Sequence, residues 1–414
     1  PSAFGGRQDR RRAREPAQQR PAQYSAGMDE ALARWLVGPQ GADALRLASE
    51  QADPSSLAAA TALRRHWRPD QAAAALQQAA LRRRGRTKFG DLAQALFLTA
   101  AGLEQATRAE VARWRAGRFA AAGVSRVVDL GCGVGADALA FLQAGLNVVA
   151  VEFDPVTAVF AAANLQSALG RAAVQRGDAQ QVAGELLRPD DAVFLDPARR
   201  SSRGRSWRVE DLSPPWEFAL SLLANRTGAI KAAPGIAHTA IPPDLAATWV
   251  SHRGDLVETS LWSGAWEPGA RVATLLPAGD ELTIPRIPHE AAIGGIGAYL
   301  YEPDPAVIRA GGASQLATLL DGWRVAAGIA YLSSDTLVDT PFATGFEVLE
   351  VLPFDERVLR AWMRGHDIGT LEIKVRGLDV DPAALRKRLK PVGTGSATLV
   401  VTPTGAGARA VVVR

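Results

Sequence analysis

The stretch Arg126-Val-Val-Asp-Leu-Gly-Cys-Gly-Val-Gly-Ala136 joins an apolar run to three closely spaced glycines. The run predicts a buried strand, and the glycines predict a tight turn that lets the backbone approach a ligand closely. Residues 136–144 then have the composition of a helix, whose first amide groups would face that ligand. Together the strand, the turn and the helix predict a binding site for a nucleotide-sized ligand.

Two classes of ligand fit the spacing of these glycines. Gly131, Gly133 and Ala136 satisfy the Gly-x-Gly-x-x-Gly/Ala fingerprint of dinucleotide-binding proteins, so spacing alone leaves a nicotinamide or flavin cofactor open. Asp129 favours a different ligand, because a carboxylate just before the first glycine would crowd a pyrophosphate. A carboxylate suits a cationic ligand that carries an amino group and hydroxyls, such as S-adenosylmethionine.

Further acidic residues follow the next predicted strands. Glu152 ends the apolar run 146–151, where an acidic side chain can accept hydrogen bonds from both hydroxyls of a ribose. Asp178 follows the next strand-like run and is a candidate for contact with an adenine amino group. Asp196 closes the run 191–195. Because the carboxyl ends of parallel strands meet at one edge of a sheet, these carboxylates and Asp129 predict one site at that edge.

This ordered set resembles the motifs of the class I S-adenosylmethionine-dependent methyltransferases, over about residues 121 to 285. The resemblance implies a Rossmann-like core of seven strands and a methyl-transfer activity. It implies that the methionine end of the cofactor binds around the glycine turn, at Asp129, Gly131, Gly133, Gly135 and Asp137. It further implies that Glu152 holds the ribose and that Asp178 holds the adenine.

A closer likeness, spanning most of the chain, is to bacterial methyltransferases with a THUMP-like C-terminal domain. It rests on Gly102-Leu-Glu-Gln-Ala-Thr107 before the core and on Leu371-Glu-Ile-Lys-Val-Arg-Gly377 near the end. The likeness implies that Glu104, Gln105 and Thr107 lie near the cofactor.

The turn Asp196-Pro-Ala-Arg199 occupies the position at which methyltransferases of exocyclic base amines carry an Asp/Asn-Pro-Pro-aromatic turn. The resemblance therefore makes Asp196 the hydrogen-bond acceptor for the amine and Pro197 the residue that offers its carbonyl. Two residues depart from this pattern. Ala198 replaces the second proline, and Arg199 replaces the aromatic residue, which removes the stacking ring. Ser213-Pro-Pro-Trp216 resembles the turn of trimethylguanosine synthases, but no strand is predicted before it, so we interpret it as a structural loop.

The predicted fold is α/β: a Rossmann-like seven-stranded core with an N-terminal helical module and a C-terminal α+β domain. Alanine-rich apolar spacing predicts helices between residues 29 and 81. We expect a disordered basic tail over 1–25, the helical module over 26–120, the methyltransferase domain over 121–290 and a THUMP-like domain over 297–414. The boundary before the last domain is the Pro- and Gly-rich segment 277–297.

The composition excludes several classes of site. The 414 residues contain one cysteine, Cys132, which rules out an intramolecular disulfide and favours the reducing cytoplasm. We interpret Cys132 as a packing residue. The five histidines lack ligand spacing, so we predict no metal. No apolar run reaches the length of a membrane helix, and the first residues are too polar for a signal peptide.

Charge patterning bears on partners. Residues 1–20 hold six arginines and two acidic residues, which accounts for the whole net charge of +4. Basic clusters at 82–88 and 386–390 could contact RNA, or could be solvated helix faces. The resulting hypothesis is a cytoplasmic methyltransferase acting on RNA. A methyltransferase of proteins or small molecules, a non-catalytic cofactor-binding protein and a dehydrogenase are the alternatives, and the sequence does not indicate the oligomeric state.

Overall fold

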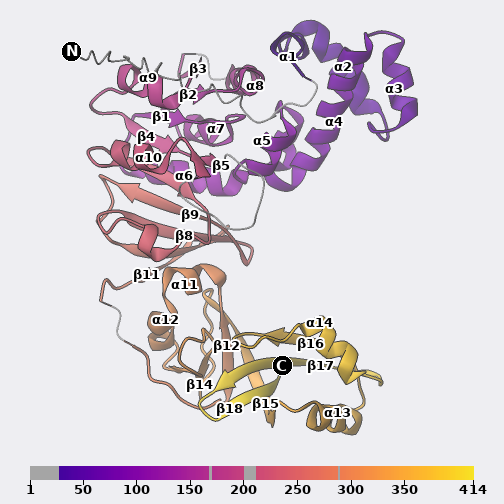
Figure 1. Cartoon of the computed structure of the whole chain (residues 1–414), viewed down its shortest axis with the longest axis vertical. Coiled ribbons are helices and arrows are strands. Elements are labelled where there is room, and N and C mark those ends of the chain that lie inside the picture. The colour runs from indigo at the N-terminus through magenta and orange to yellow at the C-terminus, as the bar shows by residue number, and fades with distance from the viewer. Residues whose placement is uncertain (1–27, 167–169, 200–210, 288–289) are drawn as a thin grey trace, which may run out of the picture.

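The computed structural model describes residues 28–166, 170–199, 211–287 and 290–414 (Figure 1). The predicted basic tail over 1–25 lies outside these residues. Three bodies follow one another along the chain: a group of helices, a large sheet flanked by helices, and a second sheet with its own helices (Figure 1). This arrangement confirms the predicted α/β core with a helical N-terminal module and a separate C-terminal sheet.

Short helices with clear start signals build the N-terminal body. Asp29 and Ser56 cap the first turns of α1 and α3, and a proline stands in the first turn of α2 and of α4. Alanine and leucine side chains fill the core between them, together with Val156 and Phe160 of the next body. The elements are α1 (Glu30–Val37), α2 (Pro39–Glu50), α3 (Leu57–Arg64), α4 (Pro69–Phe89), η1 (Gly90–Gln94), α5 (Ala100–Gln105) and α6 (Ala109–Ala121).

A sheet of nine strands forms the central body, in the order β11-β10-β8-β9-β7-β4-β1-β2-β3. The strands β3, β2, β1, β4 and β7 are parallel, and β9 runs antiparallel between β7 and β8. The strands are β1 (Arg126–Leu130), β2 (Asn147–Glu152), β3 (Ala172–Arg176), β4 (Ala192–Leu195), β7 (Gly228–Ala232), β8 (Ala246–His252), β9 (Asp255–Ser263), β10 (Arg271–Leu276) and β11 (Asp280–Ile284). The helices are α7 (Ala136–Gln143), α8 (Pro155–Leu165), α9 (Ala179–Leu186) and α10 (Trp216–Leu223), with η4 at His238–Ala240.

The predicted core of seven strands needs correction, because the sheet has nine. Residues 271–276 form β10, which extends the seven-stranded core together with β11. Strand β8, in which every residue is buried, was not predicted. A fully buried strand shows no alternation of polar and apolar residues, which removes the usual periodic signal. The Pro- and Gly-rich segment 277–297 also contains β11, so the sheet continues into the predicted boundary.

The C-terminal body is a sheet of seven strands in the order β13-β14-β12-β15-β18-β17-β16. Its helix α11 packs against β8 and β10, and the apolar side chains of α11 and α12 belong to the same core as those of the central sheet. Its elements are β12 (Tyr299–Pro303), α11 (Pro305–Ala310), α12 (Ala313–Leu319), β13 (Trp323–Arg324), β14 (Leu332–Ser334), β15 (Ala343–Pro353), α13 (Glu356–Gly365), β16 (Ile368–Val375), α14 (Pro382–Leu389), β17 (Gly395–Thr404) and β18 (Gly407–Val413).

Candidate active site

The glycine turn after β1 adopts the conformation that its sequence predicts. Gly131, Gly133 and Gly135 have φ angles of 94°, 56° and 83°, in the left-handed region that only glycine enters without strain. The backbone amides of Gly131 and Cys132 both donate to the carbonyl of Val151 at 2.9 Å, which ties the turn to the end of β2. Helix α7 begins immediately after the turn.

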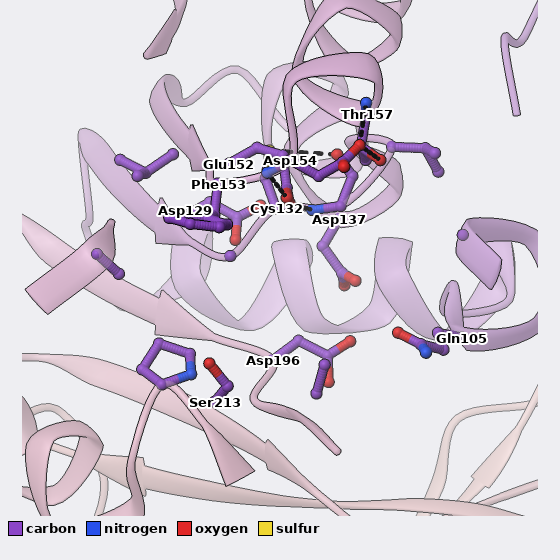
Figure 2. A pocket seen from close by; sticks show the side chains of 18 of the residues that line it. Gln105, Asp129, Cys132, Asp137, Glu152, Phe153, Asp154, Thr157, Asp196 and Ser213 are labelled. Carbon is purple, nitrogen blue, oxygen red and sulfur yellow. Dashed lines mark hydrogen bonds between the residues drawn. The ribbon is translucent and has the colours of Figure 1, made fainter. Parts of the chain in front are cut away.

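A cavity of about 540 Å³ lies beside this turn, at the carboxyl ends of the parallel strands. Seven of the predicted site residues line it: Asp129, Gly131, Gly133, Asp137, Glu152, Asp178 and Asp196. The other two predicted residues, Gly135 and Pro197, do not line the cavity. Gly135 is the N-cap residue of α7, and Pro197 is buried next to Asp196 in the sequence. Figure 2 shows Asp129, Cys132, Asp137 and Glu152 on one side of the cavity, with Asp196, Ser213 and Gln105 on the other. The predicted edge of the sheet therefore holds one site with two walls.

Asp129 is the most unusual side chain of the site. It is only 1% exposed, and neither carboxylate oxygen has a hydrogen-bond partner among the described residues. Burial, with the nearby carboxylates of Asp137 and Asp196, raises the pKa of Asp129 well above its usual range. A buried carboxylate without a partner is costly, so the cavity is matched to a ligand that brings a cationic amino group to this position.

Glu152, in contrast, is held by the backbone. Its Oε2 accepts a hydrogen bond from the Gly133 amide at 2.9 Å, and its Oε1 accepts one from the Asp154 amide at 2.8 Å. Burial raises the pKa of Glu152, while these two amides oppose that rise. The next residue, Phe153, is 54% exposed and lines the cavity. A fixed acceptor beside an exposed ring suits a ribose and an attached flat base.

Asp178 lies at the start of α9 and also lines the cavity. Its Oδ1 accepts a hydrogen bond from the backbone amide of Gln180 at 2.9 Å, as an N-cap residue does. The cap fixes the carboxylate at the cavity wall.

Asp196 forms an ion pair across the other wall. Its Oδ2 lies 2.6 Å from Nζ of Lys231 on β7. Burial opposes a charge on Lys231, but the carboxylates of Asp196, Glu258 and Asp137 outweigh it and raise the pKa of Lys231. Lys231 therefore stays protonated and offers a fixed cation to the side chain of Asp196.

A short hairpin brings a second turn to this wall. Strand β5 (Ala198–Arg199) pairs with β6 (Leu212–Ser213), so Ser213 and Pro214 line the cavity beside Asp196. This corrects our interpretation of Ser213-Pro-Pro-Trp216 as a structural loop without a preceding strand. The hairpin was not predicted because its two strands are only two residues long and lie far apart in the sequence. Trp216 itself is 6% exposed and packs in the core.

A buried arginine that the sequence analysis missed supports the floor of the site. Arg115 of α6 is fully buried and its guanidinium contacts both carboxylate oxygens of Glu258 at 3.0 Å and Oδ1 of Asp137 at 3.2 Å. It also lies 4.7 Å from the centre of the Phe194 ring. The sequence carried one signal that Arg115 is buried, because it occupies a core position in the apolar stripe of an amphipathic helix.

The segment between η1 and α6 supplies one more part of the cavity, and we call residues 96–107 the wall segment. Thr99, Gly102, Gln105, Ala106 and Thr107 line the cavity. Gln105 and Thr107, for which the likeness implies a place near the cofactor, are thus among the lining residues. Glu104 instead points away, since its exposed carboxylate lies 4.0 Å from the guanidinium of Arg84.

Cys132 also lines the cavity. Burial, with the charges of Asp129 and Glu152, raises the pKa of its thiol well above the usual value, so the reactive thiolate is disfavoured. Among the described residues no group of three or more His, Cys, Asp or Glu side chains could hold a metal ion. Every helix among the described residues is too short or too polar to cross a membrane.

Comparison with known proteins places this fold and site in one class. The chain is 36% identical, over 342 residues, to an uncharacterised S-adenosylmethionine-dependent methyltransferase found in two strains of Mycobacterium tuberculosis, and the match covers 79% of this chain and 91% of the relative. A crystal structure of a candidate methyltransferase from Porphyromonas gingivalis W83 has the same fold, with a TM-score of 0.72, 22% identity and coverage of 92% of this chain and 96% of that one.

Family models match both ends of the described chain. Residues 343–414 match a THUMP domain-like family, and residues 29–85 match DUF8688, a domain of unknown function. The Rossmann-like sheet with its acidic cavity defines an enzyme of the methyltransferase class. The chain belongs to the S-adenosylmethionine-dependent methyltransferases, and its cofactor is S-adenosylmethionine.

Proposed function

We propose that this enzyme is a cytoplasmic RNA methyltransferase that acts on an exocyclic amine of a base. The observation that carries the proposal is Asp196, a carboxylate fixed by Lys231 on the wall opposite Asp129 (Figure 2). A fixed acceptor there is suited to hold an amine that receives a methyl group. The THUMP-like match at residues 343–414 supports RNA as the substrate.

We assign the cofactor to the wall that contains Asp129. The unpartnered carboxylate of Asp129 fits the cationic amino group of the methionine end, with Asp137 as a second contact and the turn of Gly131, Gly133 and Gly135 alongside. Glu152 would accept hydrogen bonds from the ribose hydroxyls, and Asp178 would accept one from the adenine amino group. When bound, S-adenosylmethionine supplies an electrophilic methyl group on a sulfonium sulfur.

We assign the acceptor amine to Asp196 and Pro197. Lys231 occupies Oδ2 of Asp196, which leaves Oδ1 to accept one N–H of the amine. Pro197 does not line the cavity, so its carbonyl would accept the other N–H only once the substrate or this turn moves toward it. Holding both hydrogens points the nitrogen lone pair toward the methyl group, and orientation of this kind is the main contribution that an enzyme makes to a displacement reaction. The nitrogen would gain positive charge as its bond to the methyl group forms and the bond from that group to sulfur breaks. The Asp196 carboxylate would stabilise this charge until a proton leaves the nitrogen for water.

Asp196→Ala is expected to lower kcat by about 100-fold and to leave the Kd for S-adenosylmethionine unchanged, because the carboxylate acts on the acceptor and not on the cofactor. The assay measures transfer of labelled methyl groups from S-adenosylmethionine to total RNA from cells that lack the protein. Asp190→Ala, at an exposed carboxylate outside the cavity, is the control. Absence of label from the RNA, with a wild-type protein that binds S-adenosylmethionine, would overturn RNA as the substrate.

The C-terminal helix α14 carries the cations that we propose for RNA contact. Arg386, Lys387 and Lys390 are exposed along and just after this helix, whereas Arg388 is paired with Glu356 at 2.7 Å. The basic cluster at 82–88 is a poorer candidate for RNA contact, because its cations donate hydrogen bonds to carbonyls of the protein. In that cluster Arg83 donates hydrogen bonds to carbonyls at the end of α2, and Lys88 donates to carbonyls of the wall segment.

The combined replacement of Arg386, Lys387 and Lys390 by alanine is expected to weaken RNA binding and to reduce the slope of log K against log salt by about 3, roughly one for each lost phosphate contact. Fluorescence anisotropy with labelled RNA at several salt concentrations measures this slope. Arg46→Ala, at an exposed arginine of α2, should change neither quantity. An unchanged slope in the triple variant would exclude α14 as the contact surface.

A further inference from the structure

The wall segment has an unusual attachment, because side chains from two different bodies hold its backbone. Residues 96–98 lie outside any helix or strand, so their amides and carbonyls need partners from elsewhere. Buried and half-buried polar side chains supply partners to the wall segment from two sides. One set comes from α4 of the N-terminal body, and the other comes from α8 and β7 of the central body.

Helix α4 holds the wall segment at both ends. Near the start, Gln78 is 1% exposed and makes two hydrogen bonds with Leu98, one from its Nε2 to the carbonyl at 2.5 Å and one to its Oε1 from the amide at 3.0 Å. Arg82 donates to the carbonyl of Leu96 at 2.8 Å. At the far end, Nζ of Lys88 donates to the carbonyls of Glu104 and Ala106 at 2.5 Å and 2.9 Å.

The central body holds the residues in between. Asn164 of α8 accepts a hydrogen bond from the Phe97 amide at 2.7 Å and donates to the Phe97 carbonyl at 3.0 Å. Its Nδ2 also donates to the carbonyl of Val134 in the glycine turn at 2.8 Å. Lys231, which pairs with Asp196, lies 3.3 Å from the carbonyl of Gln105. The wall segment is thus fastened on one side to the groups that form the site.

The fit between the wall segment and the glycine turn is close. A Cβ atom added to Gly102 would lie 2.7 Å from Cγ1 of Val134, so a small displacement of the segment would change the contact. Phe97 packs between the Phe160 ring, with a centroid distance of 5.7 Å, and the Arg82 guanidinium at 5.0 Å. The position of the cavity wall therefore depends on the contacts that α4 makes through Gln78, Arg82 and Lys88.

We propose that the N-terminal helical body, whose family has no known function, positions the wall of the cofactor cavity through α4. Gln78 and Lys88 are positioning residues: they touch neither the cavity nor the reacting groups, but they fix the backbone that carries Thr99, Gly102 and Gln105. The inference rests on the cofactor site that we propose above. The body is then a part of the enzyme's site and not an independent binding module.

The test compares variants of α4 in the full chain. Gln78→Leu and Lys88→Met are each expected to raise the Kd for S-adenosylmethionine by about tenfold, because each leaves wall-segment carbonyls without their partner. Isothermal titration calorimetry, well below the unfolding temperature of every variant, measures the Kd. Hydrogen exchange should become faster at the amides of residues 96–107 in the same variants.

Arg83→Ala is the matched control. Arg83 belongs to the same helix and donates hydrogen bonds to the carbonyls of Ser49, Gln51 and Ala52, but it has no contact with the wall segment. Its loss should lower the unfolding temperature and leave the Kd unchanged. Equal increases of the Kd in all three variants, or none in Gln78→Leu and Lys88→Met, would overturn the inference.

Asp129→Asn separates this inference from the cofactor site itself. Loss of binding in Asp129→Asn with normal binding in both α4 variants would reject only the role of the N-terminal body. Normal binding in Asp129→Asn would instead show that the cofactor lies elsewhere.

Discussion

Asp129→Asn is expected to weaken S-adenosylmethionine binding by about 100-fold or more, because a buried charge pair with the cationic amino group is lost. The same substitution should stabilise the ligand-free protein. The wild type keeps a carboxylate at 1% exposure with no partner among the described residues, and asparagine removes the charge while keeping the shape. The expected result is therefore a loss of binding together with a gain in stability.

The stability gain should depend on pH. The pKa of Asp129 in the ligand-free fold is raised by burial, so the wild-type protein is most stable while this group is protonated and loses stability as the pH rises through the raised pKa. The variant lacks this group. Its unfolding temperature should exceed that of the wild type at pH 8, and the difference should shrink as the pH falls toward the usual carboxylate range.

Calorimetric titration and thermal unfolding measure the two effects. Asp190→Asn makes the same change of charge at an exposed position outside the cavity and should alter neither. A variant that binds S-adenosylmethionine as tightly as the wild type would contradict the assignment of Asp129. A variant that binds weakly but unfolds at a lower temperature would indicate that Asp129 has a structural partner.

Arg115→Met is expected to have the largest effect on stability, a loss of about 3 to 5 kcal/mol, because it leaves two buried carboxylates without their cation. Glu258 is 2% exposed and Asp137 is 7% exposed, so water would replace the guanidinium poorly at Glu258 and only from the cavity side at Asp137. Asp137 also lines the cavity, so the binding of S-adenosylmethionine should weaken in the same variant. Thermal and denaturant-induced unfolding measure the loss.

A second substitution identifies the cause of this loss. Glu258→Gln added to Arg115→Met should recover part of the stability, because it removes one of the unpaired charges. Burial already raises the pKa of Glu258 against the effect of Arg115. Without Arg115 that rise should increase, so the deficit of the single variant should be smaller at acid pH than at neutral pH. Equal deficits in the single and double variants at all pH values would contradict an electrostatic origin.

Arg115→Lys tests the geometry of the same group. Lysine keeps the charge but has no planar fork, so it cannot contact both Glu258 oxygens and Asp137 in the way that the guanidinium does. We expect a stability between those of the wild type and Arg115→Met.

The class of fold and most of one wall of the site follow from the amino-acid sequence. The glycine turn, the helix after it and the acidic residues at the ends of β1, β2 and β4 are local features, and each is encoded within a few residues. Their common position follows from the rule that parallel strands end at one edge of a sheet. The helical body and the C-terminal sheet were predicted for the same reason, since their periodic patterns are local.

The rest of the site depends on contacts between residues that are far apart in the sequence. Arg115 meets Glu258 across 143 positions of sequence, and Gln78 and Asn164 reach the neighbouring residues Leu98 and Phe97 from two different bodies. The hairpin of β5 and β6 brings Ser213 to Asp196 in the same way. Such contacts depend on how whole elements pack, so the residues next to a side chain in the sequence do not predict its distant partner. A buried polar residue in an apolar helix stripe signals that a partner exists, but only packing determines which one.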